Sequence, residues 1–139
     1  MSFWVLDTDT LTLLQHNHPV VSAHAAQHTP QELGTTVITV EEQLAGWYRE
    51  LRKARTPKQV ARAYRRLAES VTTLSGLPIL TFSENDIQRY QQLSALKMNI
   101  RKMDLRIAAI VLEHGAILVT RNVRDFQRIP NLTMEDWSQ

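Results

Sequence analysis

Four of the 14 acidic residues stand near the ends of predicted strands or at the start of a predicted helix: Asp7, Glu42, Asp104 and Asp125. Carboxylates gathered at one point raise each other's pKa unless a positive charge intervenes. A divalent cation supplies that charge, because Mg²⁺ and Mn²⁺ are hard ions that take oxygen ligands. A cation held in this way can activate water for in-line attack on phosphorus and neutralise the leaving oxygen. The acidic set therefore predicts metal-dependent hydrolysis of a phosphate ester.

Each of these acids also has a purely structural explanation. Asp7 and Asp104 stand where a helix N-cap would stand. Glu42 falls in the first turn of a helix predicted over 41–54, where the helix dipole favours an anion. Asp125 has arginines nearby and could form a surface ion pair. We follow the shared site, because separate capping roles give no reason for four carboxylates to converge.

Apolar runs alternate with helical patterns along the chain. Strands are predicted over 3–6, 35–40, 78–82 and 116–119, with a short fifth strand over 132–134. Helices are predicted over 8–16, 20–28, 41–54, 57–74, 84–96 and 104–114, with a loop over 97–102. This alternation predicts an α/β fold, a three-layer α/β/α sandwich with a central parallel sheet of four to five strands. In such sheets the functional crevice lies beyond the carboxyl ends of the strands.

Length and composition limit the function classes. The chain of 139 residues fits a single domain over 1–139. It has no cysteine, which excludes disulfides, thiolate metal sites and cysteine nucleophiles and suits a cytoplasmic location. No run reaches the roughly 18 consecutive apolar residues of a membrane helix, so we expect no membrane partner.

Positive charge is concentrated in one stretch although the net charge is only +2. The stretch 49–69 contains Arg49, Arg52, Lys53, Arg55, Lys58, Arg62, Arg65 and Arg66 against two acids, Glu50 and Glu69. Such a stretch is either a solvated helical face or a surface for phosphate or a partner, and both readings stay open. Trp47 stands beside it and could contact a partner, although tryptophans are more often core anchors.

Several ordered segments resemble a known family. They are 6–9 (LDTD), 38–46 (ITVEEQLAG), 104–109 (DLRIAA), 118–126 (LVTRNVRDF), 129–132 (IPNL) and 135–137 (EDW). No single segment is specific, but the ordered set spans nearly the whole chain. On these residues the sequence resembles the PIN-domain family, and within it the VapC-type ribonuclease toxins of type II toxin–antitoxin systems.

The resemblance implies roles for individual residues. Asp7, Glu42, Asp104 and Asp125 would be the catalytic and metal-binding set for Mg²⁺ or Mn²⁺. The register to Gly46 favours Glu42 over the neighbouring Glu41 as the ligand. Residues that would support this set or contact substrate are Thr8, Thr120, Asn122, Arg101 and Lys102. Asp9 is unusual at its position, and we expect it to be a helix-start charge or an exposed one.

The resemblance also implies an activity and partners. The family cleaves single-stranded or loop RNA, and several members cut tRNA. Its toxins are held inactive by a cognate VapB-type antitoxin, whose arginines can enter the acidic pocket. They usually form homodimers.

Two other functions remain as alternatives. A non-catalytic PIN-like module could bind RNA or protein, although such a module has no use for clustered carboxylates. The run from Asp7 to Leu11 is similar to the opening motif of haloacid-dehalogenase phosphatases. That class is disfavoured because Leu11 departs from the motif and no paired-acid motif or suitable lysine follows a later strand.

Overall fold

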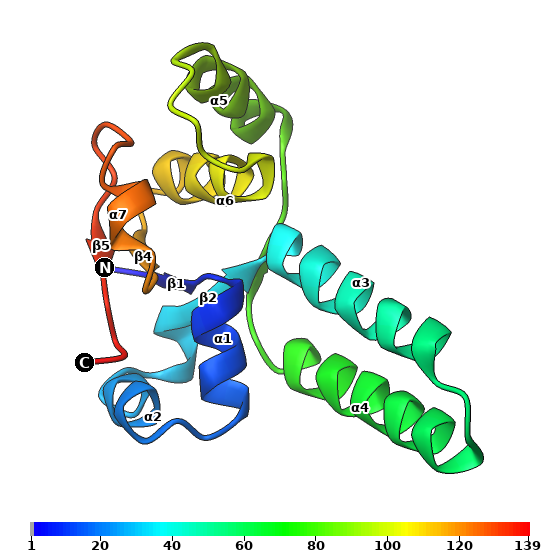
Figure 1. Ribbon diagram of the computed structural model, residues 1–139. Coiled ribbons are helices and arrows are strands. Elements are labelled where there is room, and N and C mark those ends of the chain that lie inside the picture. The colour runs from blue at the N-terminus through cyan, green and yellow to red at the C-terminus, as the bar shows by residue number, and fades with distance from the viewer. Residues whose placement is uncertain (1) are drawn as a thin grey trace.

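Five short parallel strands form the centre of the computed structural model, which describes residues 2–139 (Figure 1). They are β1 (Trp4–Leu6), β2 (Leu33–Thr36), β3 (Ile79–Leu80), β4 (Ile117–Val119) and β5 (Met134–Glu135). Their order in the sheet is β3-β2-β1-β4-β5, and every pairing is parallel. The chain adds β2 and β3 on one side of β1, and β4 and β5 on the other. The strand order therefore reverses between β1 and β4. In open α/β sheets, ligands bind beyond the carboxyl ends of the two strands at such a point.

Helices cover both faces of this sheet. They are α1 (Thr8–Gln15), α2 (Pro19–Ala25), α3 (Val37–Lys53), α4 (Pro57–Ser75), α5 (Glu84–Ala95), α6 (Lys102–Glu113) and α7 (Val123–Phe126), with a 3₁₀ turn, η1, over Pro30–Glu32. The predicted α/β/α sandwich is confirmed. No helix within residues 2–139 is both long and apolar enough to cross a membrane.

The alternation of side chains along the strands separates two cores. Val5 packs with α5, α6 and α7 on one face, whereas its neighbour Leu6 packs with α1 and α2 on the other. Leu118 and Val119 of β4 divide in the same way. Successive strand residues point to opposite faces, so two apolar residues in a row anchor a layer on each side. Both layers thus fix the ends of β1 and β4, where the candidate site lies.

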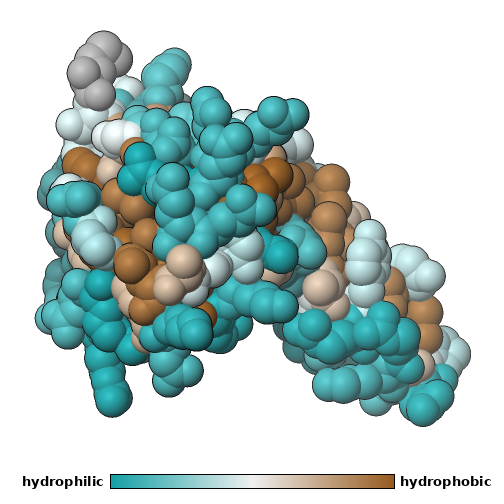
Figure 2. All heavy atoms as spheres, turned by 90° about the horizontal axis from the view of Figure 1, so that it is seen from above, coloured by the Kyte–Doolittle hydropathy of each residue, from teal (hydrophilic) through white to brown (hydrophobic). Residues whose placement is uncertain are grey.

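Helices α3 and α4 form an antiparallel arm that projects from the body (Figure 1). Thr56 begins α4 with a capping box shared with Gln59, and Pro57 occupies the first helical turn. Figure 2 shows the arm as a protrusion with hydrophobic and hydrophilic side chains on its visible surface. The arm thus offers mixed, accessible surface outside the two cores.

The strand predicted over 35–40 is wrong over 37–40. β2 ends at Thr36, whose hydroxyl accepts a hydrogen bond from the Thr39 backbone N–H at 3.2 Å and caps α3. The β-branched residues 37–40 are therefore helical, because the N-cap and tertiary packing outweigh their modest strand preference. Glu42 consequently lies in the second turn of α3 and not in the first.

The start of α6 also differs from the prediction. The helix begins at Lys102, so the predicted loop 97–102 is one residue too long at its end. Asp104 is the third helical residue, and its predicted position as an N-cap is wrong because Arg101 occupies the cap. The sequence did not indicate α7, which contains Asp125, and β5 lies two residues beyond the start of the predicted strand 132–134.

Candidate active site

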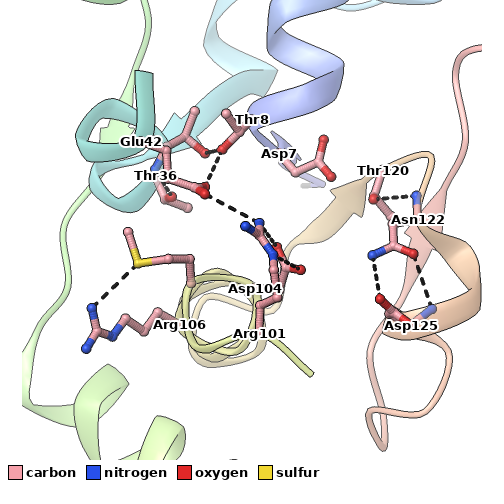
Figure 3. A network of polar contacts seen from close by, with 12 residues as sticks. Asp7, Thr8, Thr36, Glu42, Arg101, Asp104, Arg106, Thr120, Asn122 and Asp125 are labelled. Carbon is pink, nitrogen blue, oxygen red and sulfur yellow. Dashed lines mark hydrogen bonds and ion pairs between the residues drawn. The ribbon is translucent and has the colours of Figure 1, made fainter. Parts of the chain in front are cut away.

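A pocket of about 310 Å³ opens at the carboxyl ends of β1 and β4. Three buried or half-buried carboxylates line it, from Asp7 after β1, Glu42 on α3 and Asp104 on α6, and the exposed Asp9 of α1 lines it as well. Arg101 and Asn122 complete much of its polar wall. Residues nearly 100 positions apart in the chain thus share one hollow, and Figure 3 shows their side chains converging from separate elements.

Asp7 is the deepest of the three carboxylates. It is 7% exposed and caps α1, accepting a hydrogen bond from the Thr10 backbone N–H at 2.9 Å. Burial raises the pKa of Asp7, and hydrogen bonds from Thr120 and Thr10 oppose this shift only in part. The capping explanation is therefore confirmed, and it does not exclude a role in the pocket, because the same carboxylate also lines it.

Glu42 is held by hydroxyl groups. The Thr8 hydroxyl donates to Glu42 Oε1 at 2.6 Å and lies 3.1 Å from the Thr39 hydroxyl. Thr39 precedes Glu42 by three residues, which places both on one face of α3. The neighbouring Glu41 is exposed and does not line the pocket. The predicted preference for Glu42 over Glu41 agrees with this placement.

Arg101 lies between two of the carboxylates. Its guanidinium donates to both oxygens of Asp104, at 3.1 and 3.2 Å, and its Nη2 lies 3.4 Å from Glu42 Oε2. The hydrogen bonds and charge of Asp104, assisted by Glu42, raise the pKa of Arg101 further above its usual value. Arg101 therefore stays protonated and supplies a positive charge where the carboxylates meet.

Asp125 does not join the other three acids. Its carboxylate accepts hydrogen bonds from Arg128 at 2.7 Å and from the Asn122 amide at 3.0 Å, and it lines a different hollow. The Asn122 hydrogen bond, assisted by Arg128, lowers the pKa of Asp125. Asn122 lines the acidic pocket and contacts Asp125, so it connects this acid to the site (Figure 3).

The remaining predicted residues occupy distinct positions. Thr120 is buried, and its hydroxyl accepts from the Asn122 backbone N–H at 2.9 Å. Asp9 is an exposed first-turn residue of α1, as predicted, and pairs with Arg121 at 3.1 Å on the pocket rim. Lys102 is exposed at the start of α6 and does not line the pocket.

The chemistry of the donors suits a hard divalent cation, because Asp7, Glu42 and Asp104 present carboxylate oxygens to one pocket. Within residues 2–139 no ion pair engages Asp7, although burying a charged carboxylate without a counter-charge is unfavourable. In the same range no three His, Asp or Glu side chains are grouped closely enough to hold one ion together. The Arg101 guanidinium lies between Glu42 and Asp104. A cation shared by the three carboxylates therefore requires Arg101 to withdraw and the carboxylate side chains to come closer together.

Sequence reasoning missed three residues of this site. Thr12 and Phe126 line the pocket, and Thr39 contacts Thr8 beneath Glu42. A helical spacing of four from Thr8 to Thr12 could have indicated Thr12. The prediction of a strand over 35–40 did not place Thr39 one helical turn before Glu42. Phe126 is apolar, so a search for polar or charged groups does not identify it.

Comparison with known proteins gives a consistent match. A PIN-domain family model matches residues 5–132. The chain is 30% identical to ribonuclease VapC1 of Haemophilus influenzae strain R2866 over 142 aligned positions, which cover 98% of each protein.

Solved structures agree with that match. The DNA-bound VapBC complex from Salmonella typhimurium includes a chain with a TM-score of 0.79 and 26% identity, covering 99% of both chains. VapBC2 from Rickettsia felis, bound to a promoter DNA fragment, includes one with a TM-score of 0.77 and 25% identity, covering 97% of this chain and 98% of that one.

Proposed function

The chain belongs to the PIN-domain family, and we propose that it is a VapC-type endoribonuclease that hydrolyses RNA phosphodiester bonds with Mg²⁺ or Mn²⁺. The observation that carries this proposal is the pocket at the carboxyl ends of β1 and β4, where Asp7, Glu42 and Asp104 line one hollow and Arg101 pairs with Glu42 and Asp104. The similar protein named a ribonuclease supports RNA as the substrate, with tRNA as one candidate target.

Asp7, Glu42 and Asp104 would hold the ion. When bound, the ion lowers the pKa of water and neutralises charge on the phosphate. The chain's own contribution is to orient the donors. Thr8 fixes Glu42 through its short hydrogen bond, while the α1 N-terminus and Thr120 fix Asp7. Such orientation of ligands by neighbouring groups commonly sets metal affinity.

Two further side chains face the substrate in this proposal. Arg101, once withdrawn from Glu42 and Asp104, is close enough to the pocket to bind the RNA phosphate. Asn122 lines the pocket and contacts substrate through its amide. Asp125 acts as a positioning residue, because its carboxylate accepts a hydrogen bond from that same amide. Lys102 adds only a peripheral charge.

A VapB-type antitoxin is the proposed protein partner. The Salmonella and Rickettsia structures are VapBC complexes, and this chain shares their fold over nearly its whole length. Exposed apolar side chains on the arm, at Tyr48, Val60, Tyr64 and Val71, provide surface for it. We also propose a homodimer and a cytoplasmic location, where the RNA substrate is found.

A nuclease assay on a tRNA pool tests the function. Wild type and Asp104→Asn are compared with Mg²⁺ or Mn²⁺ and with EDTA, and circular dichroism checks that the variant is folded. We expect cleavage only by the wild type with a divalent ion. Equal cleavage by both proteins would reject the catalytic assignment, and cleavage by neither would favour the non-catalytic binding module.

A further inference from the structure

A groove leads from the acidic pocket onto the α3–α4 arm. It has a volume of about 520 Å³ and shares Thr8, Thr12 and Glu42 with the acidic pocket. From there it runs between α1 and α3 to Trp47 and reaches Arg66 of α4. We call it the Trp47 groove and define it by Thr12, Gln15, Gly46, Trp47, Arg49 and Arg66. Because it shares a wall with the acidic pocket, a chain seated in the pocket can continue along it.

Trp47 stands where several hollows meet. It lines the groove, a hollow of about 330 Å³ between α3 and α4, and another of about 240 Å³ beside His16. Its side chain is half-buried, so part of the indole is accessible. An indole reached from three hollows has few neighbours on those sides. Trp47 is therefore available to stack on a ligand, whereas Trp137, at 2% exposure, is a core residue.

Gly46, which precedes Trp47 in α3, places no side chain in the groove. A Cβ built at Gly46 would meet only the Arg49 guanidinium, at 3.7 Å. Packing therefore does not require glycine here, although glycine inside a helix costs about 0.5–1 kcal/mol relative to alanine. The small residue leaves room in the groove next to the indole.

The floor between the pocket and Trp47 is polar. The Gln43 amide donates to Gln15 Oε1 at 3.0 Å and to the Thr12 hydroxyl at 3.3 Å. Amides and hydroxyls suit the edges of bases and the ribose, which carry donors and acceptors.

Arginines along the groove are free of intramolecular ion pairs. In the part of the chain that the structure describes, no ion pair engages Arg49 or Arg66. Glu50 also lines the groove, and its carboxylate pairs with Lys53 at 4.0 Å. Arg65 pairs with Glu69 at 3.9 Å. Cations beside an accessible aromatic ring are the combination that binds single-stranded nucleic acid.

We propose that the Trp47 groove binds the single-stranded RNA segment adjacent to the cleaved phosphate. The Trp47 indole stacks on a base, and Arg49 and Arg66 contact phosphates. The inference rests on the proposed ribonuclease function, which requires a phosphodiester in the acidic pocket. It adds the path by which the strand leaves that pocket.

Binding without cleavage is the first test. A fluorescein-labelled single-stranded RNA is titrated in EDTA, and its anisotropy gives the affinity. We expect Trp47→Ala to weaken binding about 5- to 100-fold, the range of base–aromatic stacking. Trp47→Phe, which keeps an aromatic ring, retains much of the affinity. Trp4→Phe is the matched control far from the groove and leaves binding unchanged.

Arg66 and its neighbour Arg65 provide a second, matched pair. Both side chains are exposed on α4, but Arg66 lines the groove whereas Arg65 pairs with Glu69. We expect Arg66→Ala to weaken binding and to reduce the salt slope of log K by about one. Arg65→Ala produces a clearly smaller change in both quantities.

The outcomes separate this inference from the proposed function. Wild-type binding with losses in Trp47→Ala and Arg66→Ala supports it. If both variants bind and cleave RNA as the wild type does, the groove proposal is overturned while the ribonuclease stands. If the wild type neither binds nor cleaves RNA, both fail. Loss of antitoxin binding with intact RNA binding would instead make the groove a protein-docking surface.

Discussion

The acidic pocket and the basic arm carry opposite charges and are built in opposite ways. Asp7 and Asp104 are 7% and 8% exposed and are fixed by hydrogen bonds from α1 and Arg101. Arg49 and Arg66 on the arm are exposed, and no ion pair within residues 2–139 engages them. Fixed, buried groups suit chemistry at one atom, whereas mobile, exposed cations suit a phosphate backbone. Catalysis and RNA affinity should therefore be separable by mutation.

We expect the largest difference in kcat between variants of two neighbouring glutamates, Glu42 in the pocket and Glu41 outside it. Glu42→Gln should lower kcat on the order of 10²–10³-fold, because it removes a negative charge from the proposed metal site. Glu41→Gln, on the exposed side of α3, should stay within about twofold of the wild type. Steady-state cleavage of one RNA substrate measures both. Equal losses of kcat in the two variants would show that Glu41 is also part of the site.

A substitution of Asp125 tests whether this residue acts through Asn122 or belongs to the carboxylates of the pocket. Asp125→Asn should lower kcat about 10- to 100-fold, because it disturbs the Asn122 amide without removing a charge from the pocket. Its effect should be smaller than that of Asp104→Asn when both are assayed with the same RNA and ion. A loss as large as that of Asp104→Asn would place Asp125 among the direct metal ligands.

Arg101 lies inside the pocket but is 65% exposed at its side chain, so it shares features of both regions. Arg101→Gln should tighten Mn²⁺ binding about 3- to 10-fold, because it removes a competing positive charge. Lys102→Gln, next to it and outside the pocket, is the matched control and should change the affinity little. Isothermal titration calorimetry measures both. Weaker Mn²⁺ binding in Arg101→Gln would mean that the arginine supports the metal site and does not compete with it.

Asp7 gives the smallest effect, one on stability. Its folded-state pKa is raised by burial, so the stability it contributes is full below the unfolded value of 3.8 and is lost as pH rises through the folded pKa. Without metal at neutral pH, Asp7→Asn should therefore raise Tm by a few degrees, about 2–5 °C, and should raise it less near pH 4. Thermal denaturation in EDTA at both pH values measures this.

Asp125 serves as a control in the same measurement, because its pKa shift has the opposite direction and predicts the opposite change in Tm. Its folded-state pKa is lowered by Asn122 and Arg128, so its contribution is present above the unfolded value of 3.8 and is lost as pH falls through the folded pKa. Asp125→Asn should lower Tm at neutral pH and approach the wild type in acid. If both variants shifted Tm in the same direction at neutral pH, the contrast between the buried Asp7 and the partly exposed Asp125 would be wrong.

The sequence predicted the layers of the fold well, because hydrophobic periodicity decides them. Runs such as 3–6 and 116–119 are short and apolar, which favours buried strands over helices. It failed at 37–40, where β-branched residues are helical because Thr36 caps α3. Side-chain capping of this kind depends on where the preceding strand ends, which local propensity does not reveal.

The candidate site was predicted in part for a similar reason. Asp7, Glu42 and Asp104 follow from a general rule about the carboxyl edge of parallel sheets. The separation of Asp125 depends on its hydrogen bonds to Asn122 and Arg128 within a short helix that has no strong sequence signal. The placement of Arg101 between two carboxylates depends on tertiary packing of α6 against α3, which no local pattern encodes.

We propose that Asp7, Glu42 and Asp104 together hold a divalent cation at the carboxyl ends of β1 and β4. An anomalous difference map from a crystal grown with Mn²⁺ tests it most directly. The account predicts a strong peak among Asp7, Glu42 and Asp104, with the Arg101 side chain turned away. A peak confined to other surfaces, with Arg101 still bridging Glu42 and Asp104, would contradict it.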